Sequence, residues 1–419
     1  MKYLNELGAA AKNAAAQLNG LTEEVIDAVL NESAKLLREN EAFLIAENQK
    51  DIENARAKGM TDAFIDRLTL NAKVIEGIAT GIEEVARLKS PVGKTLYSYK
   101  NEYQDIDIKK IAVPFGVIGI IFESRPNVTA DAFALCFKTR NAVILRGGSD
   151  AINSNVAIVG VIKNALKNCG VDENAVAVLT DTSRETAAQF MKLNEYVDLL
   201  IPRGGASLIK TALKEATVPV IETGLGNCHV YIDASADAVM SANVVFNAKT
   251  QRYSVCNACE SLVVHSAVLN DVLPVIAERL AEKNVEIRCD ERAYEAIKDR
   301  PFVTRATEED FYTEYGAAVI SVKTVDSAEQ AIAHINEHST HHSEAIITED
   351  TAVAEKFLNG VDSACVYHNA STRFSDGFVF GLGAEIGIST QKLHARGPMG
   401  LDALCTTKYV VKGNGSIRK

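Results

Sequence analysis

Hydrophobic side chains along the first 90 residues recur at the spacing of helices. From Thr22 onward the apolar positions follow a 3.6-residue period, at Val25, Ile26, Val29, Leu30, Leu36 and Leu37. A further helix is expected from about Ala72 to Leu88. This region offers no residues whose chemistry suggests a site, so we expect it to act as a helical scaffold.

The pattern changes between Thr95 and Val113, where apolar and polar residues alternate. This alternation indicates β-structure with one face in water. The apolar positions are Ile106, Ile108 and Ile111, and the polar ones are Asp105, Asp107 and Lys109. Strands outside a main sheet are suited to subunit contact, but a surface hairpin is an equally good interpretation.

From Gly116 to about Glu222 the chain repeats a unit of strand, turn and helix. Apolar strands are predicted at 116–122, 142–146, 175–179, 197–202 and 218–222. Helices are predicted between them, at 154–168, 184–192 and 207–216. Such a succession is typical of a parallel sheet covered on both faces, which binds ligands at the carboxyl ends of its strands.

A second succession of strands and helices begins near Asp237. Its predicted strands are at 261–265, 317–322, 345–348 and 364–367, followed by a loop-rich stretch from 369 to 400 and a final strand at 406–411. The predicted fold class is therefore α/β with two parallel-sheet domains. Cys256 falls where the two successions join, and clefts between domains are common places for small-molecule sites.

The charge balance argues against polyanionic partners. The 419 residues include 44 Lys and Arg against 55 Asp and Glu, a formal net charge of −11. A surface that binds nucleic acid or an anionic membrane needs a basic face, so we expect neither partner. The N-terminal segment carries charges where a signal peptide needs apolar residues, and no run of about 18 apolar residues occurs. We therefore expect a cytoplasmic protein.

Two Arg-Gly-Gly triplets, Arg146-Gly147-Gly148 and Arg203-Gly204-Gly205, follow predicted strands and precede predicted helices. Glycine lets the backbone approach a ligand closely, and free N–H groups at a helix N-terminus bind phosphate. An ordinary turn with a solvated Arg is the alternative. We interpret the matched pair as a nucleotide site, and an Arg directly after a strand can bind a ribose 2′-phosphate, which favours NADP over NAD.

The eight cysteines are scattered, apart from Cys256 and Cys259. Scattered cysteines are typical of small core residues in a reducing compartment. The Cys256-Asn-Ala-Cys259 spacing fits a redox dithiol or half of a zinc site, but zinc needs a second ligand pair that the spacing does not offer, so we expect no metal. A nucleophilic Cys256 with Cys259 as a packing residue is the interpretation we favour. A buried, inert Cys256 is the alternative.

Long motifs occur in order along the chain, at 117–127, 143–149, 199–205, 247–252, 254–257, 369–377 and 381–398. The last contains Glu385-Ile-Gly-Ile-Ser-Thr-Gln-Lys-Leu-His-Ala-Arg-Gly-Pro398, which is long enough to be very specific. Together these motifs closely resemble the γ-glutamyl phosphate reductase family of the aldehyde dehydrogenase superfamily. The resemblance covers nearly the whole chain.

The resemblance implies three structural parts. They are a cofactor-binding domain (1–95 and 114–232), a catalytic domain with the nucleophilic cysteine (233–395) and a small oligomerisation element (96–113 and 396–419). It also implies that NADPH reduces L-glutamyl 5-phosphate to L-glutamate 5-semialdehyde and phosphate, the second step of proline biosynthesis. We expect a homo-oligomer, and a transient glutamate 5-kinase partner is plausible because acyl phosphates decompose readily.

The resemblance also implies roles for residues around the reacting group. Cys256 matches the family's nucleophile, and a donor from the turn at Ser124 together with the Cys256 N–H is expected to stabilise the oxyanions. Arg125 is the first candidate for the substrate phosphate, because Arg binds phosphate in a bidentate geometry, and Asn127 is expected nearby. The alternative for Arg125 is a salt bridge to Glu123 or another acid.

Other residues are expected to bind the α-carboxylate of the substrate and the ribose of the cofactor. Arg373, His394 and Arg396 are candidates for the substrate α-carboxylate, and Glu314 is a candidate for the nicotinamide ribose. Glu222 stands where hydrolytic aldehyde dehydrogenases keep the Glu that activates water. Since water would destroy the acyl-enzyme of this reaction, we expect Glu222 either to be held away from it or to face the cofactor.

Two other functions remain open. A non-phosphorylating aldehyde dehydrogenase on the same fold would oxidise the semialdehyde without phosphate. A catalytically inactive scaffold subunit of a glutamate kinase complex would need neither Cys256 nor the polar loops, so their presence counts against it.

Overall fold

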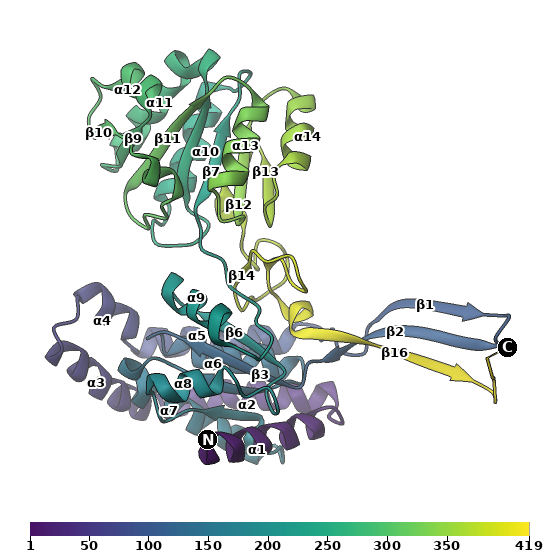
Figure 1. Cartoon of the computed structure of the whole chain (residues 1–419). Coiled ribbons are helices and arrows are strands. Elements are labelled where there is room, and N and C mark those ends of the chain that lie inside the picture. The colour runs from purple at the N-terminus through teal and green to yellow at the C-terminus, as the bar shows by residue number, and fades with distance from the viewer. Residues whose placement is uncertain (419) are drawn as a thin grey trace. The chain divides into compact units, whose positions relative to one another are not determined.

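The computed structural model describes residues 1–418, which form two compact units (Figure 1). Unit 1 comprises Met1–Glu222, Gly381–Gly387 and the chain from Met399 onward, and unit 2 comprises Thr223–Phe380 and Ile388–Pro398. Each unit is built on its own parallel sheet. Among the described residues, no helix is long and apolar enough to cross a membrane.

The N-terminal region of unit 1 is helical, as predicted. Its helices are α1 (Lys2–Leu18), α2 (Glu23–Glu39), α3 (Glu41–Ala57), α4 (Asp62–Leu68) and α5 (Ala72–Arg87). α2 buries Ile26, Val29, Leu30 and Leu37 on one face, which is the stripe that the 3.6-residue period predicted. α1 contacts the strands of the sheet directly, whereas α2, α3 and α5 pack against α6 (Asn127–Lys138) and α7 (Ile152–Asn168) and form an outer layer.

The sheet of unit 1 is parallel and has the strand order β5-β4-β3-β6. Its strands are β3 (Val117–Phe122), β4 (Ala142–Arg146), β5 (Val176–Val178) and β6 (Leu199–Arg203). The connecting and following helices are α6 (Asn127–Lys138), α7 (Ile152–Asn168), α8 (Arg184–Phe190) and α9 (Ala206–Glu215). Right-handed crossovers place α6 and α7 on one face and α8 on the other. The strands are apolar on both faces because both faces are covered.

One predicted strand of unit 1 does not form. The segment 218–222 makes only an isolated bridge between Leu200 and Val220. The Leu200 N–H donates to the Pro219 carbonyl at 2.8 Å, and the Ile221 N–H donates to the Leu200 carbonyl at 2.9 Å. The ladder stops there because neither Pro219 nor Pro202 has an N–H with which to form the next bond.

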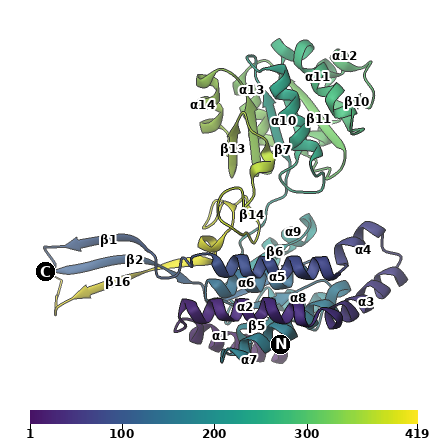
Figure 2. The same cartoon turned by 180° about the vertical axis from the view of Figure 1, so that it is seen from behind.

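An antiparallel sheet of three strands extends from unit 1 (Figures 1 and 2). It consists of β1 (Thr95–Asn101), β2 (Ile106–Pro114) and β16 (Cys405–Gly413), in the order β1-β2-β16. Both β1 and β16 expose large apolar side chains, namely Leu96, Tyr97, Tyr99, Tyr409 and Val411. The alternating segment at 95–113 therefore forms β-structure, and the final strand pairs with it.

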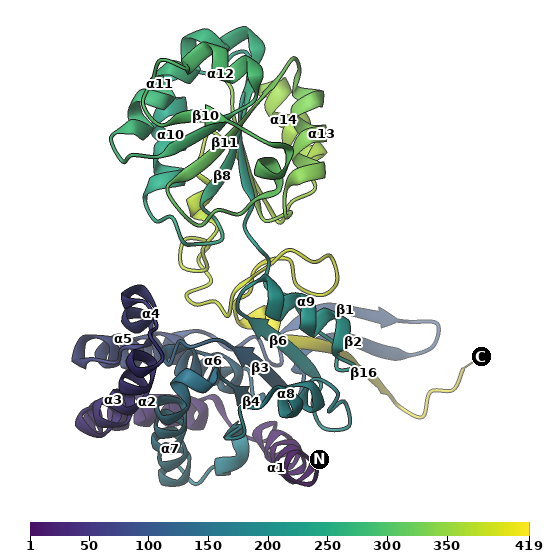
Figure 3. The ribbon, with the colours of Figure 1, turned by 60° about the vertical axis from the view of Figure 1, so that its left-hand side comes forward.

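Unit 2 contains a parallel sheet of seven strands in the order β10-β9-β11-β8-β7-β12-β13 (Figure 3). The strands are β7 (Cys228–Ile232), β8 (Cys259–His265), β9 (Glu286–Cys289), β10 (Val303–Arg305), β11 (Val319–Val325), β12 (Ser343–Ile347) and β13 (Cys365–His368). The helices are α10 (Ala238–Thr250), α11 (Leu269–Ala281), α12 (Glu291–Ile297), α13 (Ala328–His338) and α14 (Thr351–Gly360). Helices α10, α11 and α12 share one core with the sheet, and α13 and α14 share another.

The boundaries between the units differ from those expected. β7 pairs with β8 and β12, so residues 223–232 belong to unit 2 and not to the first domain. Near the C-terminus, β14 (Ile388–Ser389) pairs with β15 (Gly397–Pro398) inside unit 2. The segments on either side of this hairpin, 381–387 and 399 onward, belong to unit 1, so the chain crosses between the units several times.

Candidate active site

Cys256 lies in the turn between α10 and β8, at the amino end of a central strand of unit 2. Its side chain is partly exposed, whereas Cys259 and Cys228 are buried. Burial raises the pKa of Cys259 to about 12, so Cys259 remains a thiol at neutral pH. Of the two cysteines in the Cys-x-x-Cys motif, only Cys256 has the solvent access that a nucleophile needs.

The backbone of Cys256 is held by the segment that precedes β7. A side chain on Gly226 would collide with the Cys256 carbonyl group, so this position requires glycine. The Cys228 thiol donates a hydrogen bond to the same carbonyl, with 3.1 Å between sulfur and oxygen. Sequence reasoning assigned neither residue a role, although Gly224-Leu-Gly226 signalled a close backbone approach.

Asn257, next to the nucleophile, fastens the turn to the short helix η5 (Thr372–Phe374). Its Nδ2 donates to the carbonyl oxygens of Ser375 at 2.9 Å and Arg373 at 3.4 Å. In return, the Thr372 hydroxyl donates to the Asn257 carbonyl at 2.7 Å. Asn257 is only 5% exposed, so these bonds are shielded from water and fix η5 against the Cys256 turn.

The Arg373 side chain lies beside this turn, so the structure brings two predicted site residues together. Its Nε donates to Gln251 Oε1 at 2.8 Å. Burial lowers the pKa of Arg373, attraction to Cys256 raises it, and repulsion by Arg252 lowers it. A cleft of about 540 Å³ runs past Arg373 between α10 and the 369–379 segment, lined by Asn243, Val244, Asn247, Gln251, Asn369, Ala370, Ser371, Arg373, Phe374, Asp376 and Val379.

His394 and Arg396 lie in the hairpin region 388–398 of unit 2. Arg396 is bound to Asp362, with 2.9 Å between Nη1 and Oδ1, and Lys392 shares the same carboxylate. His394 has a φ of 64°, in the left-handed region. The Arg396 guanidinium is therefore already engaged by an acid of the protein.

Glu314 is connected to the backbone that supports Cys256. Its carboxylate accepts a hydrogen bond from the Gly226 N–H, which lowers its pKa, but burial has the larger effect and the net pKa is raised. Beneath it, Lys249 and Glu260 form a fully buried ion pair at 2.5 Å, and the Gly316 N–H donates to Glu260 at 3.2 Å. Glu314, the residue predicted to bind the nicotinamide ribose, is therefore bonded to the segment that supports Cys256.

In unit 1 the polar turns meet at one edge of the sheet, as parallel strands require. Arg146 Nη2 donates to the Thr182 carbonyl at 2.7 Å, while its buried Nε has no partner among the described residues. Gly147 and Gly148 are closely packed: a side chain would strike Asn155 at the first and the Ser124 hydroxyl at the second. An unpartnered guanidinium N–H beside a tight glycine turn fits an anionic ligand such as a nucleotide phosphate.

The second Arg-Gly-Gly turn differs from this expectation, because an acid of the protein already occupies it. Glu123 Oε1 accepts the Gly205 N–H at 2.9 Å, and a side chain on Gly204 would strike the same carboxylate. Glu123 thus occupies the backbone N–H of Gly205, the residue that precedes α9.

Two further acids lie in this edge region of unit 1. Asn127 Nδ2 donates to Asp131 Oδ2 at 3.1 Å, and burial raises the pKa of Asp131 to about 6. Burial also raises the pKa of Glu222, the last residue of the first segment of unit 1. Asp131 was missed from the sequence, because one acid within a helix has no distinguishing pattern.

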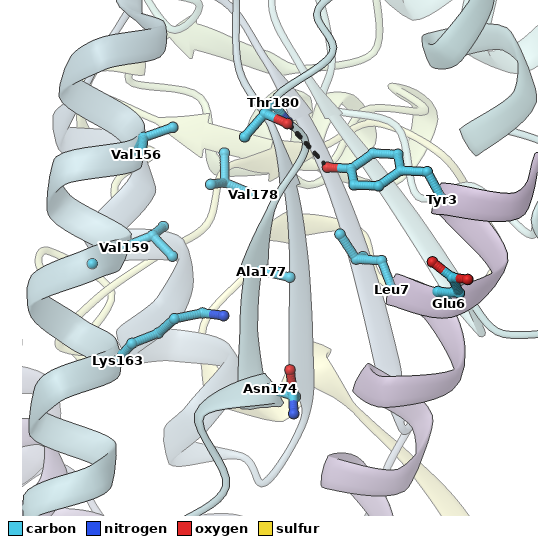
Figure 4. Close-up of a pocket in the computed structure, with 11 residues that line it drawn as sticks. Tyr3, Glu6, Leu7, Val156, Val159, Lys163, Asn174, Ala177, Val178 and Thr180 are labelled. Carbon is cyan, nitrogen blue, oxygen red and sulfur yellow. Dashed lines mark hydrogen bonds between the residues drawn. The ribbon is translucent and has the colours of Figure 1, made fainter.

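A separate cavity of about 510 Å³ lies beside the edge strand β5, between α1 and α7 (Figure 4). Val156, Val159 and Leu7 provide its apolar walls, and the Tyr3 hydroxyl reaches Thr180 at 3.4 Å. It contains none of the predicted site residues. Within residues 1–418, no group of three or more His, Cys, Asp or Glu side chains is arranged to hold a metal ion.

Comparison with known proteins identifies the class of protein that this fold and site define. Residues 2–296 and 301–410 match the model of the aldehyde dehydrogenase family, and the chain belongs to that family. An acetylating aldehyde dehydrogenase from Geobacillus thermoglucosidasius shares the fold with a TM-score of 0.68, at 18% identity and covering 100% of this chain and 98% of that one. The predicted α/β fold class is confirmed.

Closer similarity is to one branch of that family. Gamma-glutamyl phosphate reductases of Lachnospira eligens and Ligilactobacillus salivarius are each 53% identical to this chain, covering 100% and 99% of both sequences respectively. The crystal structure of gamma-glutamyl phosphate reductase from Thermotoga maritima has a TM-score of 0.97 at 44% identity, covering 99% of this chain and 100% of that one. The family and the reductase name of these relatives imply a nicotinamide cofactor.

Proposed function

We propose that the chain is an NADPH-dependent γ-glutamyl phosphate reductase, which forms L-glutamate 5-semialdehyde in proline biosynthesis. The observation that carries the mechanism is the Cys256 turn, which presents a partly exposed thiol beside the Arg373 guanidinium while its neighbouring thiols are buried. A thiolate is the form that attacks a carbonyl carbon, and a nearby positive charge favours that form.

The first chemical step needs only the nucleophile and a leaving group. The Cys256 thiolate attacks the acyl carbon, the new C–S bond forms, and the C–O bond to phosphate breaks with its electron pair on the phosphate oxygen. Phosphate leaves without acid assistance because it is already a good leaving group. The product is a glutamyl thioester on Cys256.

An oxyanion forms on the acyl oxygen twice, once when the thiolate attacks and once when the hydride is transferred. We assign their stabilisation to the Cys256 N–H and a donor from the turn at Ser124, and one such donor typically contributes about 3 kcal/mol. Arg125, Asn127, Arg373, His394 and Arg396 are the candidates for the substrate's anionic groups. Arg396 is the weakest of these, because its guanidinium is already bound to Asp362.

Arg146 and the glycines that follow it are the proposed anchor for the cofactor. NADPH, when bound, supplies the hydride that reduces the thioester. The unpartnered Arg146 Nε supports a 2′-phosphate ligand and therefore NADP over NAD. Gly204 and Gly205 would shape the turn near the cofactor, but the Gly205 N–H would not bind it, because this N–H already donates to Glu123. Glu314 remains the candidate for the ribose, and we place Glu222 toward the cofactor.

The three-part organisation of the chain is also part of this proposal. Unit 1 would bind the cofactor and unit 2 would carry the nucleophile. The sheet of β1, β2 and β16, with its exposed tyrosines, would join subunits of a homo-oligomer. We place the enzyme in the cytoplasm, and a transient glutamate 5-kinase would protect the labile acyl phosphate in transit.

The phosphate requirement of the reverse reaction tests this function. Purified protein should oxidise glutamate 5-semialdehyde with NADP only when inorganic phosphate or arsenate is supplied. Oxidation that proceeds at the same rate without either anion would indicate a non-phosphorylating aldehyde dehydrogenase. A protein that shows no oxidation under any of these conditions would fit the inactive scaffold.

A further inference from the structure

Arg252 and Arg373 place two positive charges at the nucleophile. The bond from Arg373 Nε to Gln251 Oε1, at 2.8 Å, holds this guanidinium against the residue that precedes Arg252. Asn257, which follows Cys256, donates to the Ser375 carbonyl and accepts from the Thr372 hydroxyl, and these bonds hold η5 against the Cys256 turn. Arg373 is consequently attracted by Cys256 and repelled by Arg252, so all three side chains share one neighbourhood within unit 2.

Neither of these two arginines is paired with a carboxylate in the way that several other arginines of the chain are. Arg38 and Arg288 each bind two carboxylates, and Arg396 binds Asp362. Within residues 1–418, neither Arg252 nor Arg373 forms an ion pair with a carboxylate. In a chain with 55 acidic and 44 basic residues, two guanidinium groups near one thiol and without a bound carboxylate are suited to an external anion.

Asp376 also attracts Arg373, but its carboxylate is already engaged. Its Oδ1 accepts the N–H groups of Phe378 at 2.9 Å and Val379 at 3.2 Å. This carboxylate therefore shapes the 376–379 turn. The arginine pair keeps a net positive charge.

We propose that Arg252 and Arg373 bind the phosphate group of the acyl phosphate, and inorganic phosphate in the reverse direction. The inference rests on the proposed function. The phosphate is bonded to the same carbon that Cys256 attacks, so its binding site must adjoin the sulfur. Guanidinium groups match phosphate oxygens in charge and geometry. They also offset the repulsion between the thiolate and the phosphate dianion, which would otherwise oppose the attack.

This assignment gives the phosphate a binding site in the same unit as the nucleophile. When the C–O bond breaks, the departing electron pair stays on an oxygen held by the two arginines. In reverse, the same oxygen attacks the thioester carbon and expels the thiolate. The bonds from Asn257 position η5 before phosphate arrives, so little reorganisation is needed.

The test measures semialdehyde oxidation with NADP over a range of inorganic phosphate concentrations. Arg252→Gln and Arg373→Gln should each raise the KM for phosphate at least tenfold while leaving the KM for NADP near that of the parent. Arg252→Lys should recover part of the loss, because it restores charge without the planar fork. Arg300→Gln, which removes an exposed arginine elsewhere in unit 2, serves as the matched control.

A binding measurement without turnover separates this proposal from general damage. Inorganic phosphate alone should slow alkylation of Cys256 by iodoacetamide in the parent and in Arg300→Gln, but not in Arg252→Gln. Unchanged phosphate KM and unchanged protection in both arginine variants would overturn the proposal. So would a raised phosphate KM confined to Arg125→Gln. If the parent needs no phosphate at all, the proposed function itself fails, which is a different result.

Discussion

The two sheets present their chemistry at opposite ends of their strands. In unit 1 the polar turns follow β3, β4 and β6, at the carboxyl ends where ligands of open α/β sheets normally bind. In unit 2 the nucleophile precedes β8, at the amino end of the sheet. The rule about strand ends therefore locates the proposed cofactor turns but would not have located Cys256.

This difference has an electrostatic consequence. A turn that leads into a helix N-terminus offers N–H groups to an anion, whereas the Cys256 turn follows the C-terminus of α10, where the helix dipole is negative. The C-terminus of α10 therefore does not stabilise a thiolate on Cys256, so positively charged side chains are needed for that purpose. Arg373 and Arg252 are the side chains placed to do so.

The largest expected effect comes from removing the nucleophile. Cys256→Ser should lower kcat by about 1000-fold or more, because a hydroxyl is a far weaker nucleophile at neutral pH. The measurement is phosphate-dependent oxidation of the semialdehyde. Near-normal activity of Cys256→Ala would show that the covalent mechanism is wrong.

The next effect concerns the backbone behind the nucleophile. Gly226→Ala should lower kcat by roughly 100-fold, because the new methyl group displaces the Cys256 carbonyl, and small misplacements of reacting groups cost about this much. Gly160→Ala is the matched control: Gly160 lies in α7 with open space around it, so this change should keep activity and raise stability by about 0.5–1 kcal/mol. Equal activities of the two variants would contradict the close contact at Cys256.

On the unit 1 side, Arg146→Ala should reduce the preference for NADP over NAD. Loss of a charged hydrogen bond of about 1.5–3 kcal/mol corresponds to roughly 10–100-fold in the ratio of kcat/KM values. The comparison needs both cofactors in the parent, in Arg146→Ala and in Arg87→Ala, whose side chain is 74% exposed on α5. A preference that does not move would remove Arg146 from the 2′-phosphate site.

The smallest effect is expected at the other cysteine of the motif. Cys259→Ala removes a buried thiol at the start of β8 and should keep most of the activity, with a modest loss of stability. Activity assays together with thermal unfolding distinguish the two properties. If activity fell as far as in Cys256→Ser, the motif would have to act as a pair.

Much of the fold could be predicted because local patterns determine it. Strands such as β3, β4 and β8 are continuous apolar runs, and the predicted ranges agree with them within a few residues. The missed strands β7, β9 and β10 are short or carry polar residues, as in Glu286-Ile-Arg-Cys289, and only their neighbours in the sheet make them strands. The segment at 218–222 was predicted as a strand but makes only an isolated bridge, because Pro219 limits the pairing of this apolar run.

The site was predictable only in part. Motif and resemblance pointed to Cys256 and Arg373, but Asn257 acts on Ser375, 118 positions away, and no spacing in the sequence reveals such a contact. Similarly, the two Arg-Gly-Gly triplets look alike as sequence, and only the structure shows that Glu123 closes the second.

The central claim is that Cys256 carries the acyl group as a thioester that phosphate discharges. The most direct measurement mixes the protein with semialdehyde and NADP, without phosphate, in a rapid-kinetics instrument. The account predicts a burst of about one NADPH per active site, followed by steady turnover only after phosphate is added. The burst should be absent in Cys256→Ser. Continuous NADPH formation without phosphate, or a burst that survives loss of the thiol, would contradict it.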